Sequence, residues 1–364
     1  MTYTFEIVTT QRCNMACTYC FEKEELQNPK IQNNESAIIK AVHKLLDSPD
    51  FNSIFDSITL SFWGGEPTLN APLIIRLFEE FVNSPVNYFF YTNGFNANHI
   101  TNILLKHKMY YGTQDNLSFQ ISYDGLTHDG ARIDHSGNGT SSRILKNIEL
   151  LLNDFPEAHF NLKSTIEVKS LLDMVPNWNH FHSLMQNHSN LKWSPTLEYT
   201  NTYTITPKFL ENIEKEFLKI AKLEIVNFEE NNKFVFSWFE QSAPALCTAG
   251  KNICNVDLDG NVSVCHGSLY SEDKKDFIFS HVSDDDIVLK IINSYWYYDK
   301  LLSTPELCVG CTATACFQCP TVQYSASSKQ SKEERFHDPK IDLCDIYKVF
   351  GKIGRTTRKY LNLN

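Results

Sequence analysis

The sequence lacks long hydrophobic runs and has no excess of basic residues. No stretch of its 364 residues approaches the roughly 18 apolar residues that a membrane helix needs. The first five residues show no basic segment followed by an apolar one, so they are not a secretory signal. The net charge of −10 disfavours nucleic-acid binding, which requires a basic face. We therefore expect a soluble, cytoplasmic protein that binds neither membranes nor nucleic acid.

Cysteine, in contrast, is abundant and clustered. The chain has eleven cysteines, an odd number, and eight of them fall within residues 247–344. In a chain without a secretory signal, this usage favours thiolates bound to metal in a reducing compartment over a set of disulfides. The length and the hydrophobic content of 42% are typical of a globular protein with a large core, in about two domains.

The first 222 residues alternate predicted strands with predicted helices. Strands are expected over residues 3–9, 57–63, 88–91, 117–123, 159–168 and 192–199. Helices are expected over residues 37–46 with Asn34 as N-cap, 72–82, 99–106, 142–152, 173–185 and 207–222. This alternation implies parallel strands with functional groups at their carboxyl ends. We predict an α/β fold, with a partial (β/α)6 TIM-like barrel over residues 1–230 and a small cysteine-rich module over residues 231–364.

Three cysteines follow the first predicted strand. Cys13, Cys17 and Cys20 are separated by three and two residues, a spacing that can hold a small iron–sulfur cluster. Because a four-iron cluster takes four cysteines for complete ligation, one iron would stay open, as at catalytic metal sites. A zinc knuckle is the alternative, although zinc sites usually show paired C-x2-C units. The spacing resembles the signature of the radical S-adenosylmethionine (radical SAM) enzymes, which implies a bound SAM and its reductive cleavage to a 5′-deoxyadenosyl radical.

Further motifs at predicted strand ends resemble SAM contacts of that family. Gly64-Gly65-Glu66-Pro67 resembles the GGEP motif, whose glycines let backbone carbonyls approach the SAM amino group. Ser122 and Asp124 resemble the ribose-binding position. An ordinary turn is the alternative reading at these sites. The other candidate contacts are Tyr19 near the adenine, Asn93 near the adenosine and, for the carboxylate, Arg132, Arg143 or Lys163, among which the sequence does not choose.

The C-terminal cysteines resemble a SPASM domain, which implies two auxiliary four-iron clusters. The family pattern C-x2-C-x5-C-x3-C is one residue longer in each of its last two gaps than the run over residues 308–319. By resemblance to sulfatase-maturating members, cluster I is assigned to Cys247, Cys254, Cys265 and Cys319. Cluster II is assigned to Cys308, Cys311, Cys316 and Cys344. Three, four and four ligands then use all eleven cysteines, and a zinc ribbon over residues 308–319 is the alternative.

The residues after the fourth predicted strand limit the choice among the radical SAM enzymes. His128-Asp129-x-x-Arg132 followed by Gly137-x-Gly139-Thr140 resembles peptide-modifying radical SAM enzymes and sulfatase-maturating enzymes. This resemblance implies an enzyme that oxidatively modifies a ribosomally made precursor peptide, through a C–C (cyclophane-type) or thioether cross-link. The auxiliary clusters would accept the second electron. The expected partners are the precursor peptide, a flavodoxin- or ferredoxin-like electron donor and, unless the barrel mouth holds the leader, a separate leader-binding protein.

Two alternative functions stay open. An anaerobic sulfatase-maturating enzyme would oxidise a Cys or Ser to formylglycine, but the acidic residue that this family places after the third cysteine of its C-terminal module is here His266. His266 is either a catalytic base, since imidazole titrates near neutrality, or a loop residue. A non-catalytic iron–sulfur or zinc adaptor is the other alternative, and the open three-cysteine site argues against it.

Three polar segments of the chain need no function of their own. Residues 284–286, three aspartates, are interpreted as the start of a helix and not as a metal site, because carboxylates suit the helix dipole. Residues 325–335 are predicted to be an exposed loop. Residues 348–359 are predicted to form a helix with a charged face.

Overall fold

The computed structural model describes two compact units. It describes all residues except 21, 23–28, 187, 189, 199–203, 242–246, 272, 303–307, 314, 315, 317, 318, 320, 322, 323, 326, 337–342 and 364. The first unit comprises Met1–Ser122, His128–Phe160 and Thr248–Leu301. The second comprises Tyr123–Thr127, Asn161–Cys247 and Leu302–Asn364. The predicted division between residues 230 and 231 stays a prediction.

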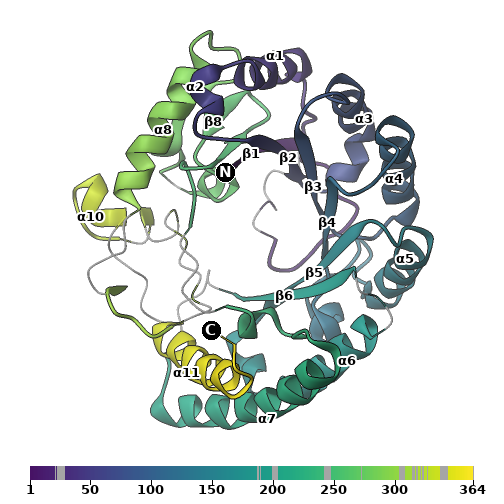
Figure 1. Ribbon diagram of the computed structural model, residues 1–364, viewed down its shortest axis with the longest axis vertical. Coiled ribbons are helices and arrows are strands. Elements are labelled where there is room, and N and C mark those ends of the chain that lie inside the picture. The colour runs from purple at the N-terminus through teal and green to yellow at the C-terminus, as the bar shows by residue number, and fades with distance from the viewer. Residues whose placement is uncertain are drawn as a thin grey trace. The chain divides into compact units, whose positions relative to one another are not determined.

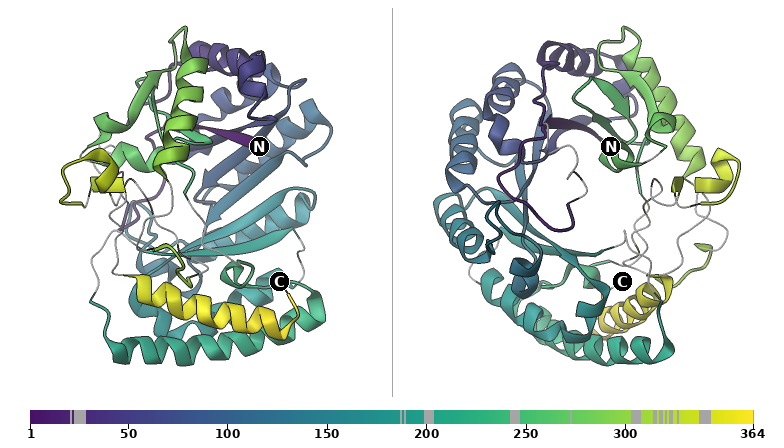
Figure 2. Two further views of the ribbon diagram at one scale, coloured as in Figure 1. Left: turned by 60° about the vertical axis from the view of Figure 1, so that its left-hand side comes forward. Right: turned by 180° about the vertical axis from the view of Figure 1, so that it is seen from behind.

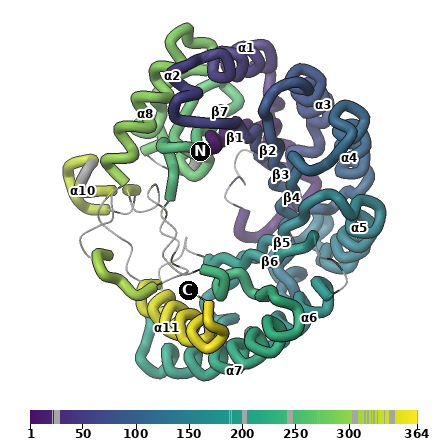
Figure 3. The backbone as a smooth tube through the Cα atoms, in the orientation of Figure 1, coloured from purple at the N-terminus to yellow at the C-terminus, as the bar shows by residue number. Residues whose placement is uncertain are grey.

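The first unit is built on a sheet in which β1 is central. Its strands run in the order β4-β3-β2-β1-β7-β8-β9, and β1 lies between β2 and β7 (Figure 3). Their bounds are β1 Thr2–Thr10, β2 Ser57–Gly64, β3 Val86–Thr92, β4 Leu117–Ser122, β7 Ile253–Val256, β8 Asn261–Ser263 and β9 Ile278–His281. The strands from β4 to β7 pair in parallel, whereas β8 and β9 are antiparallel. In β3 and β4 buried residues alternate with partly exposed ones, so one face of these strands packs into the core and the other is only partly covered.

Helices line the first unit's strands on one side (Figure 1). They are α1 Glu35–Leu46, α2 Pro49–Asn52, α3 Ala71–Glu80, α4 Ala97–Tyr111, α5 Ser141–Asp154 and α8 Ile287–Leu301. Each long helix buries an apolar stripe, as α3 does with Leu73, Ile74, Leu77 and Phe78. Asn34 stands at the N-cap of α1, but its side chain makes no capping bond and instead donates to Gln32 and Leu258.

The second unit holds two strands and the longest helix of the described chain. Its elements are β5 His159–Ile166, which starts in the first unit, α6 Val175–Met185, β6 Leu191–Leu197, α7 Pro207–Asn231, α10 Lys332–Phe336 and α11 Cys344–Tyr360. Helix α11 runs along α7 (Figure 2), where Phe350 packs against Phe217 and Trp238 with ring centroids 4.4 and 4.5 Å apart. No helix in the described ranges is both long and apolar enough to cross a membrane.

Several predicted boundaries differ from the observed ones. Helix α7 continues nine residues beyond Lys222, to Asn231, because the buried Glu224 accepts hydrogen bonds from the Trp178 indole and from the backbone N–H groups of Val235 and Phe236. The segment predicted as a loop over residues 325–335 includes all of α10 except its last residue, Phe336. The junction between the two predicted domains is expected over residues 231–245, of which residues 242–245 lie outside the described residues, as does Tyr199 of the sixth predicted strand.

Candidate active site

The Gly64-Gly65 turn at the end of β2 holds the loop that carries the first three cysteines. Gly65 N–H donates to Thr10 O at 2.9 Å, and Glu66 N–H donates to Arg12 O at 2.8 Å. The approach is so close that a Cβ on Gly64 would lie 2.2 Å from Thr10 O. Gly64 also has a φ of 123°, which side-chain-bearing residues rarely adopt. The turn therefore requires glycine, and the motif and the cysteine loop form one structural element.

Glu66 is a buried carboxylate that joins the ends of β2 and β3. Its Oε1 accepts hydrogen bonds from the Thr68 hydroxyl at 2.6 Å and the Thr92 hydroxyl at 2.8 Å. Its Oε2 accepts from Asn93 N–H at 2.8 Å. Burial raises the pKa of Glu66, and these hydrogen bonds act against that rise. Glu66 thus fixes the turn at the end of β2.

Asn93 extends this network to the cysteines. Its Nδ2 donates to Asn14 Oδ1 at 2.8 Å and lies 3.7 Å from Cys13 Sγ, while its Oδ1 accepts from Phe95 N–H at 2.9 Å. The cysteine loop is also tied to a later segment, because Ala16 N–H donates to Ile133 O and Thr18 N–H donates to Ala131 O, each at 2.8 Å. The loop is therefore held by main-chain bonds on two sides.

The three thiols of this loop are half-buried and influence one another. Burial raises the pKa of Cys13 to about 12, and the negative charges of Glu66, Cys17 and Cys20 contribute. Bound iron would reverse this effect, since a coordinating thiol is deprotonated. In the described part of the chain, no three His, Cys, Asp or Glu side chains are placed to hold one metal ion. Thiolates of a four-iron cluster bind separate irons, so the loop fits a cluster better than a single ion.

The first unit also contains Tyr19 and two of the three candidate cations. The Arg132 guanidinium lies 5.2 Å from the centre of the Tyr19 ring, and the Arg143 guanidinium lies 3.8 Å from that of Phe95. His128 and Asp129 act within their own segment, where His128 bonds to Thr140 and Asp129 accepts from Ser141. The motif around these two residues therefore shapes the turn that leads into α5.

The remaining candidate SAM contacts lie at the ends of β4 and in β5. Ser122 is the last residue of β4, in the first unit. Asp124 and Lys163 belong to the second unit, where Asp124 Oδ1 accepts from Thr165 N–H at 2.8 Å. Lys163 donates to the Thr196 hydroxyl, and burial lowers the pKa of Lys163 to about 8. The roles of these residues stay predictions.

His266 pairs with a carboxylate that sequence reasoning missed. Glu6, in the middle of β1 and 1% exposed, accepts from His266 N–H at 3.0 Å, and its Oε1 lies 2.9 Å from His266 Nδ1. The His266 ring also packs on Trp63, with centroids 4.4 Å apart. Burial acts to lower the pKa of His266, but Glu6 outweighs it and the pKa is raised. The available signal was that Glu6 is the one charged residue of β1.

The eight C-terminal cysteines divide between the units. None of the eleven cysteines, all of which are described, forms a disulfide. Cys254 and Cys265 lie in the first unit, whereas Cys247, Cys308, Cys311, Cys316, Cys319 and Cys344 lie in the second. Burial raises the pKa of Cys344, and the charges of Cys308 and Cys311 add to that rise, so these three thiols are neighbours. They fit a shared cluster by donor chemistry and proximity.

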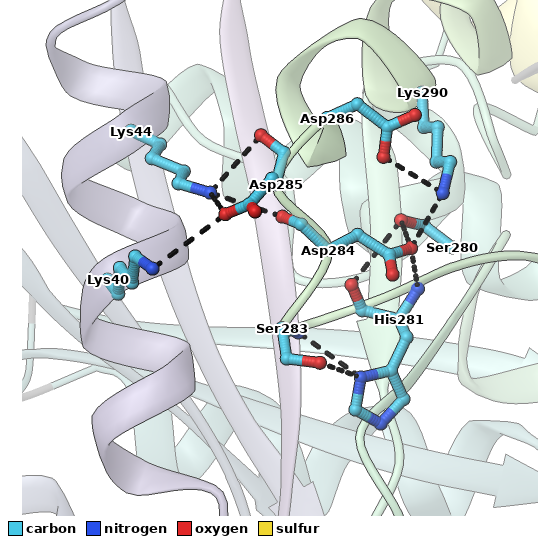
Figure 4. A network of polar contacts seen from close by, with 9 residues as sticks. All are labelled: Lys40, Lys44, Ser280, His281, Ser283, Asp284, Asp285, Asp286 and Lys290. Carbon is cyan, nitrogen blue, oxygen red and sulfur yellow. Dashed lines mark hydrogen bonds and ion pairs between the residues drawn. The ribbon is translucent and has the colours of Figure 1, made fainter.

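The three consecutive aspartates pair with lysines (Figure 4). Asp284 accepts from Lys290 Nζ at 2.8 Å, Asp285 from Lys44 Nζ at 3.0 Å, and Asp286 lies 3.0 Å from Lys290 Nζ. The run leads directly into α8, which starts at Ile287. The structure therefore agrees with the prediction that these aspartates start a helix. Lysine ammonium groups occupy the positions that a metal ion would need.

Comparison with known proteins identifies the family to which the N-terminal half of the chain is similar. The Radical SAM superfamily matches residues 7–180, which include the cysteine loop and the Gly64–Pro67 turn. These residues form a radical SAM domain. The predicted radical SAM enzyme is thereby confirmed. A cysteine-type anaerobic sulfatase-maturating enzyme of Clostridium novyi (strain NT) is 24% identical over 318 residues, which cover 80% of this chain and 81% of that protein.

Two solved structures share the fold along the whole chain. Native anSMEcpe with bound AdoMet and Cp18Cys peptide has a TM-score of 0.71 at 17% identity, covering 100% of this chain and 99% of that one. Native anSMEcpe with bound AdoMet has a TM-score of 0.69 at 17% identity, covering 99% of each chain. This likeness and the radical SAM domain confirm the predicted fold class, an α/β partial barrel followed by a cysteine-rich region.

Proposed function

We propose that this enzyme modifies a precursor peptide oxidatively and forms a C–C or thioether cross-link. The observation that carries the proposal is the joining of the cysteine loop to the Gly64–Pro67 turn by the hydrogen bonds of Gly65 and Glu66. Support for a peptide substrate comes from anSMEcpe, a protein of the same fold whose solved structure holds both AdoMet and a peptide. The choice of a cross-link rests on the resemblance of the sequence to peptide maturases and on His266.

The first unit supplies the groups that would hold SAM and its cluster. Cys13, Cys17 and Cys20 would bind three irons, and the Gly64 and Gly65 backbone would receive the SAM amino group. Glu66 and Asn93 keep these two elements in register. Of the remaining candidates, Arg132 stands beside Tyr19, the residue assigned to the adenine. When bound and reduced, the cluster and SAM supply a 5′-deoxyadenosyl radical.

His266 is the proposed catalytic base. Glu6 binds its Nδ1 and its backbone N–H, so the ring is held at one edge and Nε2 is directed away from the carboxylate. Trp63 packs against the ring and restricts its rotation. His266 would accept the proton that leaves the substrate during oxidation, and the raised pKa that Glu6 gives its ring favours proton uptake.

The auxiliary clusters are proposed at the C-terminal cysteines, as the place to which the substrate's second electron passes. The set Cys308, Cys311, Cys316 and Cys344 is supported by the mutual influence of three of its thiols. Cys265 is proposed as a ligand of the other cluster. Because the thiolate ligands must stay reduced, a cytoplasmic location is proposed. A flavodoxin- or ferredoxin-like protein is the proposed electron donor, and either the barrel or a separate protein would hold the leader peptide.

Anaerobic sulfatase maturation is the second candidate function. The relative from Clostridium novyi, matched over 80% of this chain, supports it as well as any observation supports a cross-link. The two functions differ at the base, where this chain has His266 paired with Glu6 and not an acidic residue alone. They also differ in product, because formylglycine contains an aldehyde and a cross-linked peptide does not.

Mass spectrometry of a co-expressed peptide tests the proposal. The peptide encoded beside the gene, isolated after co-expression, should be lighter by two hydrogens and should not react with a hydrazide probe. A synthetic peptide containing the Cys or Ser of a sulfatase site, incubated with SAM and dithionite, should stay unmodified. A hydrazide-reactive product from that synthetic peptide would favour sulfatase maturation, and the absence of any 5′-deoxyadenosine would reject both functions.

A further inference from the structure

Cys254 lies in the middle of β7, and its strand neighbours fix the face on which its side chain stands. In the parallel pairing of β1 with β7, Phe5 stands opposite Cys254, and Glu6 stands opposite Asn255. Opposed residues of paired strands share a face, and successive residues alternate between faces. Cys254 therefore shares a face with Phe5, whereas Asn255 shares the other face with Glu6.

The Glu6 face of the sheet is the face of Cys265. Glu6 binds His266, the residue directly after Cys265, and Asn255 Oδ1 accepts from Trp63 Nε1 at 2.8 Å. The Trp63 ring packs on His266. Cys265 directly precedes His266, whose backbone N–H donates to Glu6 Oε2 at 3.0 Å, so the chain at Cys265 lies against this face. The proposed cluster ligand Cys265 thus belongs to the same face as Glu6.

The Phe5 face of the sheet is the helix-covered core. Tyr3, two residues from Phe5 on β1, interacts with Cys254 and packs edge-on against Phe51 and Phe55, with centroids 5.5 and 4.9 Å apart. Phe55 in turn packs against Tyr295 of α8. Cys254, Phe5 and Phe55 are each 0% exposed. The thiol is therefore enclosed by aromatic side chains that belong to the helix side of the sheet.

We infer that Cys254 is a core residue and not a ligand of auxiliary cluster I. Cys254 and Cys265 stand on opposite faces of one hydrogen-bonded sheet, and a single cluster would have to reach both through the backbone layer. Side chains on opposite faces of a strand point away from each other, so a thiolate on the Phe5 face does not reach iron that is bound on the Glu6 face. The partition of eleven cysteines into three, four and four ligands then fails at one position, and the cluster containing Cys265 needs a fourth ligand other than Cys254. The inference rests on the proposed cluster at Cys265.

Iron content of variant holoenzymes tests this inference. Cys254→Ala and Cys254→Val, one smaller and one larger than cysteine, should each keep the wild-type iron and sulfide content and the same electron paramagnetic resonance spectrum after anaerobic reconstitution. The matched control Cys265→Ala should lose about four irons per chain. Because alanine and valine bracket the volume of cysteine, a packing defect in one variant does not hide the result.

The outcomes separate the inference from the proposed function. Loss of about four irons from either soluble Cys254 variant would overturn the inference. Full iron in both Cys254 variants with loss in Cys265→Ala supports it. If Cys265→Ala also keeps all its iron, the proposed cluster at Cys265 is refuted, while the assignment of Cys254 to the core is retained.

Discussion

The N-terminal and C-terminal cysteine regions differ in what holds their thiols in place. The loop with Cys13, Cys17 and Cys20 is tied by main-chain hydrogen bonds to the Gly64–Pro67 turn and to residues 131–133. Cys344 instead takes its position from α11, which packs on α7 through Phe350 and Phe217. A site fixed by backbone bonds is arranged before iron arrives, whereas a site carried by a helix depends on that helix staying docked. The first kind of site suits SAM chemistry, which needs precise placement of the reacting atoms. The second suits electron transfer, which tolerates less precise placement of the cluster.

The largest expected effect comes from removing the N-terminal thiols. Replacement of Cys13, Cys17 and Cys20 by alanine should abolish 5′-deoxyadenosine formation and remove about four of roughly twelve irons, because no ligand for the SAM cluster remains. Chromatographic measurement of 5′-deoxyadenosine and an iron assay check this result. A triple variant that still cleaves SAM would show that the two regions do not divide the chemistry as we describe.

The matching change in the C-terminal region should separate two activities. Cys344→Ala should lose about four irons and most of the peptide product, yet continue to form 5′-deoxyadenosine with dithionite, since that step needs the N-terminal cysteines alone. Product and 5′-deoxyadenosine are measured in the same reaction. Lys359→Ala, which alters an exposed lysine in the last turn of the same helix, is the control and should behave as the wild type. A soluble Cys344→Ala enzyme that makes product at the wild-type rate would refute electron transfer through this cluster.

Stability of the α7 support should depend on Glu224. Glu224→Ala leaves the Trp178, Val235 and Phe236 donors without an acceptor and should lower the free energy of unfolding by about 2–4 kcal/mol, measured by urea denaturation. Glu229→Ala, on the exposed side of the same helix, should change it little. An equal effect in both variants would contradict a special role for the buried carboxylate.

Glu224 should also make stability depend on pH. Burial raises the pKa of Glu224 from 4.5 to about 7, so the folded protein binds this proton more tightly than the unfolded chain does. The contribution of Glu224 to stability is therefore greatest below pH 4.5 and is lost as the pH rises through 7. Glu224→Gln should flatten this part of the stability profile between about pH 5 and 8, and an unchanged slope would show that Glu224 ionises normally.

The smallest effect is expected for SAM affinity when the turn is loosened. Glu66→Ala removes the acceptor of Thr68, Thr92 and Asn93 and should weaken SAM binding roughly tenfold, about 1.4 kcal/mol, while all iron is retained. Equilibrium dialysis measures the dissociation constant. Glu79→Ala, exposed on α3, serves as the control. Normal affinity in Glu66→Ala would mean that main-chain bonds alone fix the turn.

Sequence reasoning predicted the regular part of the first unit well, because local signals define it. Strands such as β1 and β2 and helices such as α1 and α5 fall within a few residues of their predicted bounds. The glycine turn and the cysteine loop were also predicted to act together, since both follow neighbouring parallel strands. Periodicity and strand-end chemistry are short-range features, and they sufficed here.

Long-range contacts could not be predicted in the same way. Strands β7, β8 and β9 were not predicted, because each is three or four residues long and is defined by pairing with β1 or with one another. For the same reason the contact of Glu6 with His266, 260 residues apart, was missed. The face of Cys254 follows from that same pairing, so spacing alone grouped it with the other cysteines.

The origin of the hydrogen abstracted by the radical tests the central claim most directly. A precursor peptide produced in deuterated medium is incubated with the enzyme, unlabelled SAM and dithionite, and the 5′-deoxyadenosine is analysed by mass spectrometry. If the enzyme acts on the peptide as we propose, the 5′-deoxyadenosine carries one deuterium for each modified peptide. Unlabelled 5′-deoxyadenosine accompanying modified peptide would contradict direct action of the radical SAM site on that substrate.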